Sequence, residues 1–256
     1  MAAIMPMEKD TYQALPGVEV VLNDDIFAGK VQGVDVVINC AFSRSNNAAD
    51  LASGLDFTEN ILRGFELCKV NAVINISSQG VYKRLPASEL STEKSPVEPM
   101  DLYSMAKYAV EKLFLLSRVP HTTNVRLASL NMKQRFLYKF VEMVKNGQPI
   151  TLNAPNVYAS LLDVNDAARG LVALAQVPAE KWESTYNLGL GTQYSLAEYA
   201  NFVVKVGKGL GYNATIEVND NGSTTAAGMS IARLNALTGW QPTVTPEQMI
   251  EGLFAL

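Results

Sequence analysis

The strongest constraint on the fold is the alternation of short buried strands with amphipathic helices in the first half of the chain. Continuous apolar runs predict strands at residues 34–40 and 72–77, and a helix with one broad apolar face is predicted between them at 57–69. A helix at 103–117 and a strand at 124–128 follow. Strands joined by helices, with no hairpin signal, predict parallel pairing and a doubly wound α/β sheet.

A further strand is predicted at residues 18–22, ahead of this series. The second half is less regular and predicts a smaller lobe. We therefore assign residues 1–128 to the main sheet domain and 129–256 mainly to the lobe, with elements around 155–185 returning to the main sheet. The second half is predicted to contain helices at 135–145, 166–174, 195–206, 231–237 and 246–254, with strands at 149–153, 185–188 and 215–218.

The composition excludes several classes of protein. A chain of 256 residues with 48% hydrophobic and 18% charged residues is ordinary globular protein. We expect no signal peptide, no membrane span and, at a net charge of −4 without a basic patch, no nucleic-acid partner. Two cysteines and one histidine predict no metal site, and Cys40 and Cys68 fall in apolar patterns typical of the core. A cytoplasmic enzyme is expected.

Chemically informative residues gather at one predicted strand end and one predicted helix. Ser77 and Ser78 end a strand, at the edge where open α/β sheets bind ligands. Tyr103 and Lys107 lie four apart on one helix face, so the ammonium can lower the phenol pKa from about 10. Ser78 would hydrogen-bond a substrate oxygen while Tyr103 exchanges its proton, which predicts oxidation of a hydroxyl or reduction of a carbonyl.

The Tyr-x-x-x-Lys spacing is a weak signal alone, because Tyr108 and Lys112 repeat it and a surface helix contact is the commoner interpretation. Together with its surroundings, however, the chain resembles the extended short-chain dehydrogenase/reductase family, the NAD-dependent epimerase/dehydratase group, from about Val18 to its end. Glu111 matches the family's Y-x-x-x-K-x-x-x-E and selects Tyr103. The other matches are SSQGVY at 77–82, LDVNDAA at 162–168, YNLG at 186–189 and GWQP at 239–242.

The resemblance implies a Rossmann-like fold, NAD or NADP as cofactor, and Ser78, Tyr103 and Lys107 as catalytic residues. The pair at 25–26 would contact the adenine end, and the turn at 40–42 would pass under the ribose. The implied cofactor-binding residues are Asp25, Ile26, Cys40, Ala41, Phe42, Asn60, Ser77 and Lys107.

One departure from the family concerns the dinucleotide phosphates. Family members open with a strand, a Gly-x-x-Gly-x-x-Gly turn and a helix, and nothing before Val18 has that form. Residues 1–6 and 11–15 could be remnants of the second strand and its helix. Either these residues close the open edge of the sheet, or the chain is a shortened form of a longer protein. Weak cofactor binding is expected, and NAD cannot be distinguished from NADP.

Two functional hypotheses follow. The first is an epimerase or reductase acting on a sugar, free or nucleotide-linked, or on another hydroxyl or carbonyl compound. The second is a truncated, weakly active or inactive relative that acts as a binding or structural protein. Gln79 and Gly80 stand where the dehydratase branch has Asp-Glu, Ser129 replaces a sugar-contacting asparagine, and Arg135 could add positive charge, so these are candidate substrate residues.

A homodimer is also expected, through the helices at 57–69 and 103–117. Family members commonly pair these helices into a four-helix bundle. The second helix also has more apolar circumference than packing on one side of a sheet would bury, with Met105, Phe114, Leu115 and Leu116 among its residues.

Overall fold

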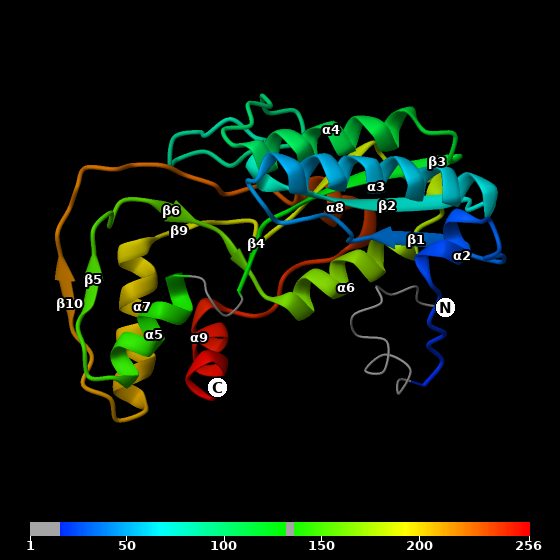
Figure 1. Cartoon of the computed structure of the whole chain (residues 1–256). Coiled ribbons are helices and arrows are strands. Elements are labelled where there is room, and N and C mark those ends of the chain that lie inside the picture. Colours follow the sequence, from blue (N-terminus) through cyan, green and yellow to red (C-terminus); the bar gives the residue numbers. More distant parts are fainter. Residues whose placement is uncertain (1–15, 132–135) are drawn as a thin grey trace. The chain divides into compact units, whose positions relative to one another are not determined.

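A four-stranded sheet with the strand order β1-β2-β3-β8 organises the fold in the computed structural model (Figure 1). The structure describes residues 16–131 and 136–256, so the predicted elements at 1–6 and 11–15 lie outside the described residues, as does Arg135. The first two strands pair in parallel, from Val36 opposite Ala72 to Asn39 opposite Asn75, as the helical connections predicted. The strands are β1 (Val36–Asn39), β2 (Ala72–Ser78), β3 (His121–Leu127) and β8 (Thr185–Leu188).

Strand β1 is an edge strand in the part of the chain that the structure describes. The side chain of Ile38 in its centre is correspondingly 36% exposed. The strand predicted at residues 18–22 is wrong, because this extended segment is not assigned to a strand and leads directly into helix α2 (Asn23–Phe27). Extended backbone becomes a strand only where a neighbour takes up its N–H and C=O groups.

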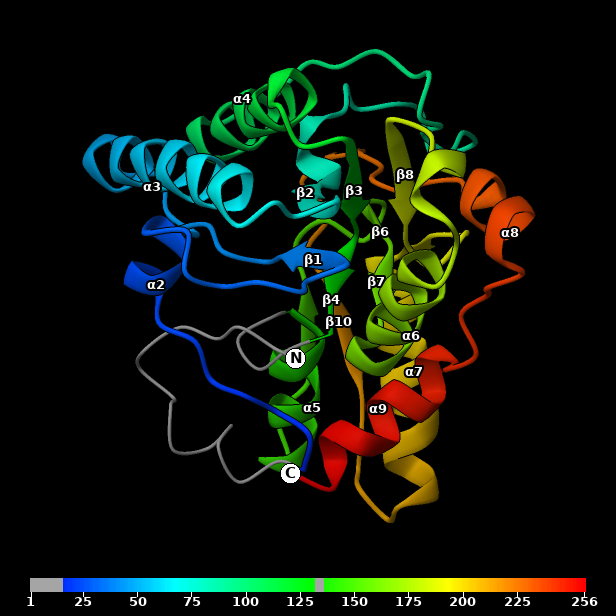
Figure 2. The ribbon, with the colours of Figure 1, turned by 90° about the vertical axis from the view of Figure 1, so that its right-hand side faces the viewer.

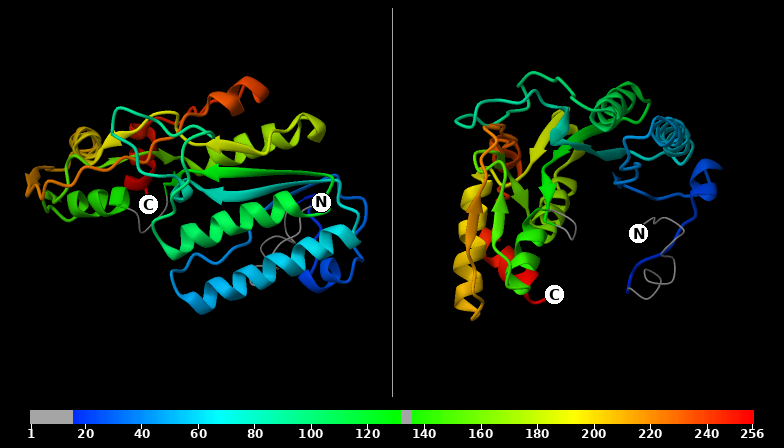
Figure 3. Two further views of the ribbon diagram at one scale, coloured as in Figure 1. Left: turned by 90° about the horizontal axis from the view of Figure 1, so that it is seen from above. Right: turned by 60° about the vertical axis from the view of Figure 1, so that its left-hand side comes forward.

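Two long helices, α3 (Ala48–Leu67) and α4 (Leu102–Leu116), run side by side over the sheet (Figure 3). Helix α3 starts nine residues before the predicted Phe57, because Oδ1 of Asn47 accepts a hydrogen bond from the backbone N–H of Ala49 at 2.8 Å. Asp101 caps α4 in the same way, accepting from Ser104 N at 2.7 Å. Their inner faces and β2 share a core containing Ile61, Phe65, Val73, Val110 and Phe114.

The chain forms two compact units. The first comprises the chain up to Val81 together with Pro99–Val125 and Val177–Thr185, and the second comprises Tyr82–Glu98, Arg126–Gln176 and Tyr186–Leu256. The first unit therefore contains α2, α3, α4 and the short helices η2 (Gln79–Val81) and η3 (Ala179–Lys181). The sequence did not predict that 82–98 belongs with the second half of the chain.

The second unit has its own core between three helices and a small parallel sheet (Figure 2). Helices α5 (Phe136–Lys145), α7 (Leu196–Gly209) and α9 (Pro246–Phe254) pack together beside β5 (Ile150–Leu152) and β10 (Ile216–Val218). The predicted N-cap of α7 is confirmed, since Ser195 and Glu198 form a capping box. The remaining elements are β4 (Ser129–Leu130), β6 (Tyr158–Ala159), β7 (Leu161–Leu162), α6 (Val164–Ala175), β9 (Tyr194–Ser195) and α8 (Ala232–Thr238).

The three family-like segments of the second half contact one another. The fully buried carboxylate of Asp166 on α6 accepts from the backbone N–H groups of Thr243 and Val244 at 3.0 and 2.9 Å. One turn later, a Cβ at Gly170 would overlap Leu188 and the Trp240 ring, so glycine is needed for this approach. These segments therefore have a structural role in holding α6 in place.

Helices long and apolar enough to cross a membrane are absent from the described residues.

Candidate active site

Lys107, the lysine of the predicted catalytic set, lies on α4, and its side chain is buried between this helix and the sheet. Lys107 is only 4% exposed, and its Nζ donates a hydrogen bond to the backbone carbonyl of Ile76 in β2. The ammonium also lies over the Phe42 ring, 4.8 Å from the centroid. Burial lowers the pKa of Lys107 from its usual 10.5 to about 8, against the opposing electrostatic effects of Cys40 and Glu111.

Tyr103 occupies the first turn of the same helix. Its backbone N–H donates to Oδ1 of Asn46 at 3.0 Å, which fixes the start of α4 against the loop before α3. Its half-buried ring lies 6.4 Å from the Phe42 ring, centroid to centroid. Phe42 therefore contacts both Tyr103 and Lys107, a role that the sequence did not predict for it.

Ser78 ends β2 at the same edge of the sheet. The backbone N–H of Gly80 donates to Oγ of Ser78 at 3.1 Å. A Cβ at Gly80 would overlap the Oγ of Ser104, the residue after Tyr103. Glycine at position 80 thus lets the end of β2 approach the first turn of α4, and the structure brings Ser78, Tyr103 and Lys107 to one end of the sheet.

The side chain of the neighbouring Ser77, a predicted cofactor-binding residue, points away from this edge. Its Oγ donates to Oε1 of Glu111 at 2.5 Å, and the two residues are 3% and 1% exposed. Alternate side chains of a strand face opposite sides of a sheet, so Ser77 faces α4 where Ser78 does not. Ser77 is therefore a buried partner of Glu111, one helical turn below Lys107.

The second Tyr-Lys pair forms a separate contact on α4. Nζ of Lys112 lies 4.7 Å from the centroid of the Tyr108 ring. Five residues rotate a helical side chain by about 140°, so Tyr108 cannot share the direction of Tyr103.

The turn after β1 is close to the site, and it corrects the prediction that Cys40 lies in the core. Cys40 is exposed and is not a core residue, because it follows the end of an edge strand, whereas Cys68 is buried as predicted. The backbone N–H of Ala41 donates to Oδ1 of Asn39 at 3.3 Å, which shapes the turn that presents Phe42.

Asn60 is not brought to the site. Its side chain is exposed on α3. Tyr103 meets the other end of this helix, near the N-cap Asn47, and Asn60 lies about 20 Å along the helix from that residue. The α3 position that faces the site is Gly54, where a Cβ would lie 3.0 Å from the Phe42 ring. The family resemblance implied a cofactor-binding role for Asn60, and the described structure instead brings Gly54 of the same helix next to Phe42.

The predicted adenine contacts have partners within the protein. Ile26 is buried in α2, and its carbonyl accepts a hydrogen bond from Sγ of Cys68 at 3.5 Å. Asp25 pairs with Lys30 at 3.3 Å in the next turn of chain. Among the predicted substrate residues, Gln79 and Gly80 form η2 after Ser78, and Ser129 is half-buried in β4.

The described residues fit one half of a nicotinamide dinucleotide. A buried ammonium with three N–H donors, a phenol and a serine hydroxyl suit the ribose and the reacting end of such a cofactor. The glycine-rich turn that would hold the pyrophosphate is absent from residues 16–131 and 136–256. The same residues contain no cluster of His, Cys, Asp and Glu that could bind a metal.

The sequence model of the NAD dependent epimerase/dehydratase family matches residues 21–189. The chain belongs to this family, whose members are oxidoreductases that use NAD or NADP. No curated protein matches the sequence.

Solved structures with the same fold include several sugar-nucleotide enzymes. RMD from Pseudomonas aeruginosa, complexed with NADPH, is 19% identical with a TM-score of 0.76, over 99% of this chain and 96% of that one. UDP-N-acetylglucosamine 4-epimerase from Bacillus cereus is 18% identical with a TM-score of 0.79, over 99% and 89%. UDP-glucuronic acid 4-epimerase from Bacillus cereus, in complex with NAD, is 17% identical with a TM-score of 0.79, over 96% and 82%.

The lowered pKa of Lys107 makes stability depend on pH. Between about pH 8 and about pH 10.5, Lys107 keeps its proton in the unfolded chain and has lost it in the folded chain. The contribution of Lys107 to the free energy of unfolding therefore rises with pH in this window. We expect the difference in unfolding free energy between wild type and Lys107→Met to shift by about 3 kcal/mol in favour of wild type from about pH 7 to about pH 10.5. Urea unfolding across this range measures it.

The matched control is Lys112→Met, which removes an exposed lysine from the same helix. Its difference from wild type should stay constant over the same pH range. A constant difference for Lys107→Met would show that the ammonium is not desolvated in the folded protein.

Proposed function

We propose that this protein is an NAD(P)-dependent epimerase or reductase that acts on a sugar, free or nucleotide-linked, or on another hydroxyl or carbonyl compound through Ser78, Tyr103 and Lys107. The observation that carries the proposal is the burial of the Lys107 ammonium against the Phe42 ring, which also lies 6.4 Å from the Tyr103 ring, centroid to centroid. Desolvation of an ammonium costs free energy. The weakly screened positive charge that results stabilises the ionised form of a nearby phenol.

The roles of the three residues follow from their chemistry. Tyr103 exchanges a proton with the substrate oxygen, acting as base when a hydroxyl is oxidised and as acid when a carbonyl is reduced. Lys107 lowers the phenol pKa electrostatically, and with its own pKa near 8 it is mostly protonated at neutral pH. Ser78 donates a hydrogen bond to the same substrate oxygen. The cofactor, when bound, accepts or supplies the hydride.

The substrate class is inferred from the family and from structural relatives. The solved structures with this fold include epimerases of UDP-N-acetylglucosamine and UDP-glucuronic acid, which makes a sugar nucleotide the first substrate to test. Gln79, Gly80 and Ser129 are the described candidates for substrate contact, and a cytoplasmic location suits soluble substrates of this kind.

A second candidate function is a binding or structural role without efficient catalysis. The observation in its favour is that residues 16–131 and 136–256 contain no Gly-x-x-Gly-x-x-Gly turn, because that turn normally supplies the backbone N–H groups that bind the pyrophosphate. The two candidates differ in whether the Ser78, Tyr103 and Lys107 set turns over a substrate.

Substitution of Tyr103 tests the catalytic candidate. With NAD⁺ or NADPH and a panel of UDP-linked sugars, followed by NMR, we expect Tyr103→Phe to lower the conversion rate about a hundredfold or more, because the acid–base group is lost. Tyr108→Phe removes the hydroxyl of the other Tyr-Lys pair and should leave the rate unchanged. Equal rates for wild type and Tyr103→Phe would exclude Tyr103 as the proton donor, and no turnover by wild type would favour the second candidate.

We also propose that the protein forms a homodimer through α3 and α4. Large apolar side chains remain exposed along α4, among them Met105, Leu113 and Leu116, of which Leu116 is 83% exposed. Phe114, which the sequence placed in the same surplus, is buried in the core instead. An exposed apolar helix face beside a second helix is typical of a subunit interface.

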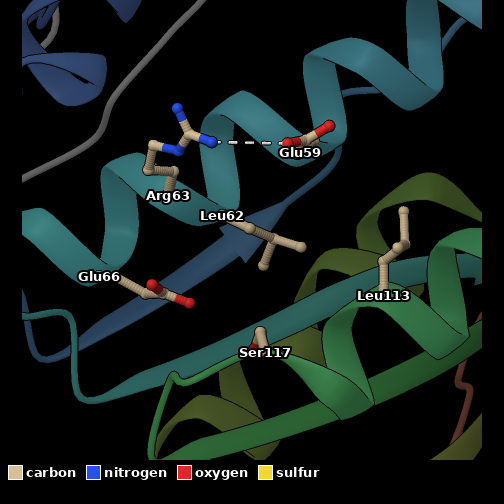
Figure 4. Close-up of a pocket in the computed structure, with 6 residues that line it drawn as sticks. All are labelled: Glu59, Leu62, Arg63, Glu66, Leu113 and Ser117. Carbon is tan, nitrogen blue, oxygen red and sulfur yellow. Dashed lines mark ion pairs between the residues drawn. The ribbon is translucent and has the colours of Figure 1, made fainter.

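A depression of about 200 Å³ between the two helices lies on this face (Figure 4). It could receive a side chain from the same face of the partner subunit, since a two-fold axis brings the same surface of both subunits together. An ion pair between Glu59 and Arg63 at 3.6 Å borders it on α3. Its lining residues are Glu59, Leu62, Arg63, Glu66, Leu113 and Ser117.

A charged residue on this face should dissociate the dimer. We expect Leu116→Glu to convert the protein to a folded monomer in sedimentation at micromolar concentration, with an unchanged circular dichroism spectrum. Val172→Glu, at an exposed apolar position on α6, is the control and should remain dimeric. A wild-type protein that sediments as a monomer would contradict the proposed interface.

A further inference from the structure

Three asparagines form a hydrogen-bonded row across the sheet beneath α4. Asn39, Asn75 and Asn124 lie in the neighbouring strands β1, β2 and β3, and they are 7%, 0% and 0% exposed. Nδ2 of Asn39 donates to Oδ1 of Asn75 at 3.1 Å, and Nδ2 of Asn75 donates to Oδ1 of Asn124 at 2.8 Å. We call Asn39, Asn75 and Asn124 the asparagine row; Figure 2 shows the three strands that carry it.

Backbone groups fix the direction of every amide in the asparagine row. At one end the N–H of Ala41 donates to Oδ1 of Asn39 at 3.3 Å. At the other end Nδ2 of Asn124 donates to the carbonyl of Glu111 at 3.3 Å. A backbone N–H can only donate and a carbonyl can only accept, so both ends impose the same orientation on the amides between them.

The two ends of the asparagine row belong to the two elements that build the candidate site. Ala41 starts the turn that presents Phe42, and Glu111 lies one helical turn after Lys107 on α4. The Phe42 ring lies over the Lys107 ammonium at 4.8 Å and beside the Tyr103 ring. The row therefore runs from the turn, through three strands, to the helix against which the turn packs.

Apolar residues could fill the same space without the cost of burying amides. Burying an amide costs free energy unless it is hydrogen-bonded, and the net gain from each such bond is only about 1 kcal/mol. A satisfied amide network instead restricts neighbouring elements to one arrangement, where apolar packing tolerates small shifts. The row is thus better suited to fixing geometry than to adding stability.

We propose that the asparagine row positions the turn at residues 40–42 against α4, and so holds Phe42 on Lys107 and Tyr103. This inference rests on the proposed function for the importance of that contact. Asn39, Asn75 and Asn124 are positioning residues in this account, because they act through the turn and the helix.

Cys40 is exposed as a residue, but partial burial raises the pKa of its thiol, so its reactivity reports on opening of the turn without any cofactor or substrate. Cys68 is buried, so a thiol reagent such as dithiobis(nitrobenzoate) reacts first at Cys40, and mass spectrometry locates the product. We expect Asn124→Leu, which breaks the row two strands away from the turn, to raise the Cys40 modification rate about threefold or more, because the released turn opens more often. A smaller rise, no change or a fall overturns the proposal.

Two further variants complete the test. Asn75→Leu breaks the row at its centre and should give the same rise, so the proposal stays testable if Asn124→Leu does not fold. Thr58→Val is the control, since its buried hydroxyl donates to the carbonyl of Gly54 in the same helix at 2.8 Å and is not a member of the asparagine row, so the Cys40 rate should not change. The readout needs no catalysis, so a failure of the proposed function and a failure of the row give different results.

Discussion

The candidate site depends on a buried lysine. An ammonium removed from water loses its hydration, and Lys107 recovers part of this cost through the Ile76 carbonyl and the face of the Phe42 ring. The remaining cost appears as the lowered pKa of the lysine. A charge held in this way is a poor source of stability, but in the proposed mechanism its weakly screened field is what a tyrosine acid–base group requires.

Polar contacts surround this lysine on the sheet side of α4. Glu111, one turn below it, is held by Ser77, and the asparagine row ends on the Glu111 carbonyl. These buried groups are partnered by one another, so α4 packs on the sheet through a polar layer near the site and through apolar residues such as Phe114 further along. The helix is thus fixed most specifically in its middle, at Lys107 and Glu111.

The sequence predicted the order of the described elements in this sheet well, because buried parallel strands and amphipathic helices have strong local patterns. The strands β1 and β2 and the helix α4 lie within a few residues of the predicted bounds. Residues 18–22 failed because a strand is defined by its neighbour, which a local pattern does not contain. The early start of α3 had a readable signal in the cap residue Asn47.

The predicted site residues fall into two groups: those that local sequence patterns can place, and those whose position depends on the tertiary structure. Ser78, Tyr103 and Lys107 follow from strand ends and helix spacing, and the structure places them together. The contacts of Phe42 and the exposure of Asn60 depend on how two helices and a turn meet, which spacing alone does not give. The asparagine row had a signal, an asparagine in each of three predicted strands, but its meaning required their register.

Titration with NADH and NADPH, followed by fluorescence or calorimetry, tests most directly whether the buried Lys107 serves a dinucleotide. We expect saturable binding with a Kd well above the micromolar range, since groups for the nicotinamide-ribose end are present and the glycine-rich turn is missing. The Lys107→Met variant, checked for folding, should lose this binding. A wild type without saturable binding, or a Lys107→Met variant that binds equally well, would contradict a cofactor site built around Lys107.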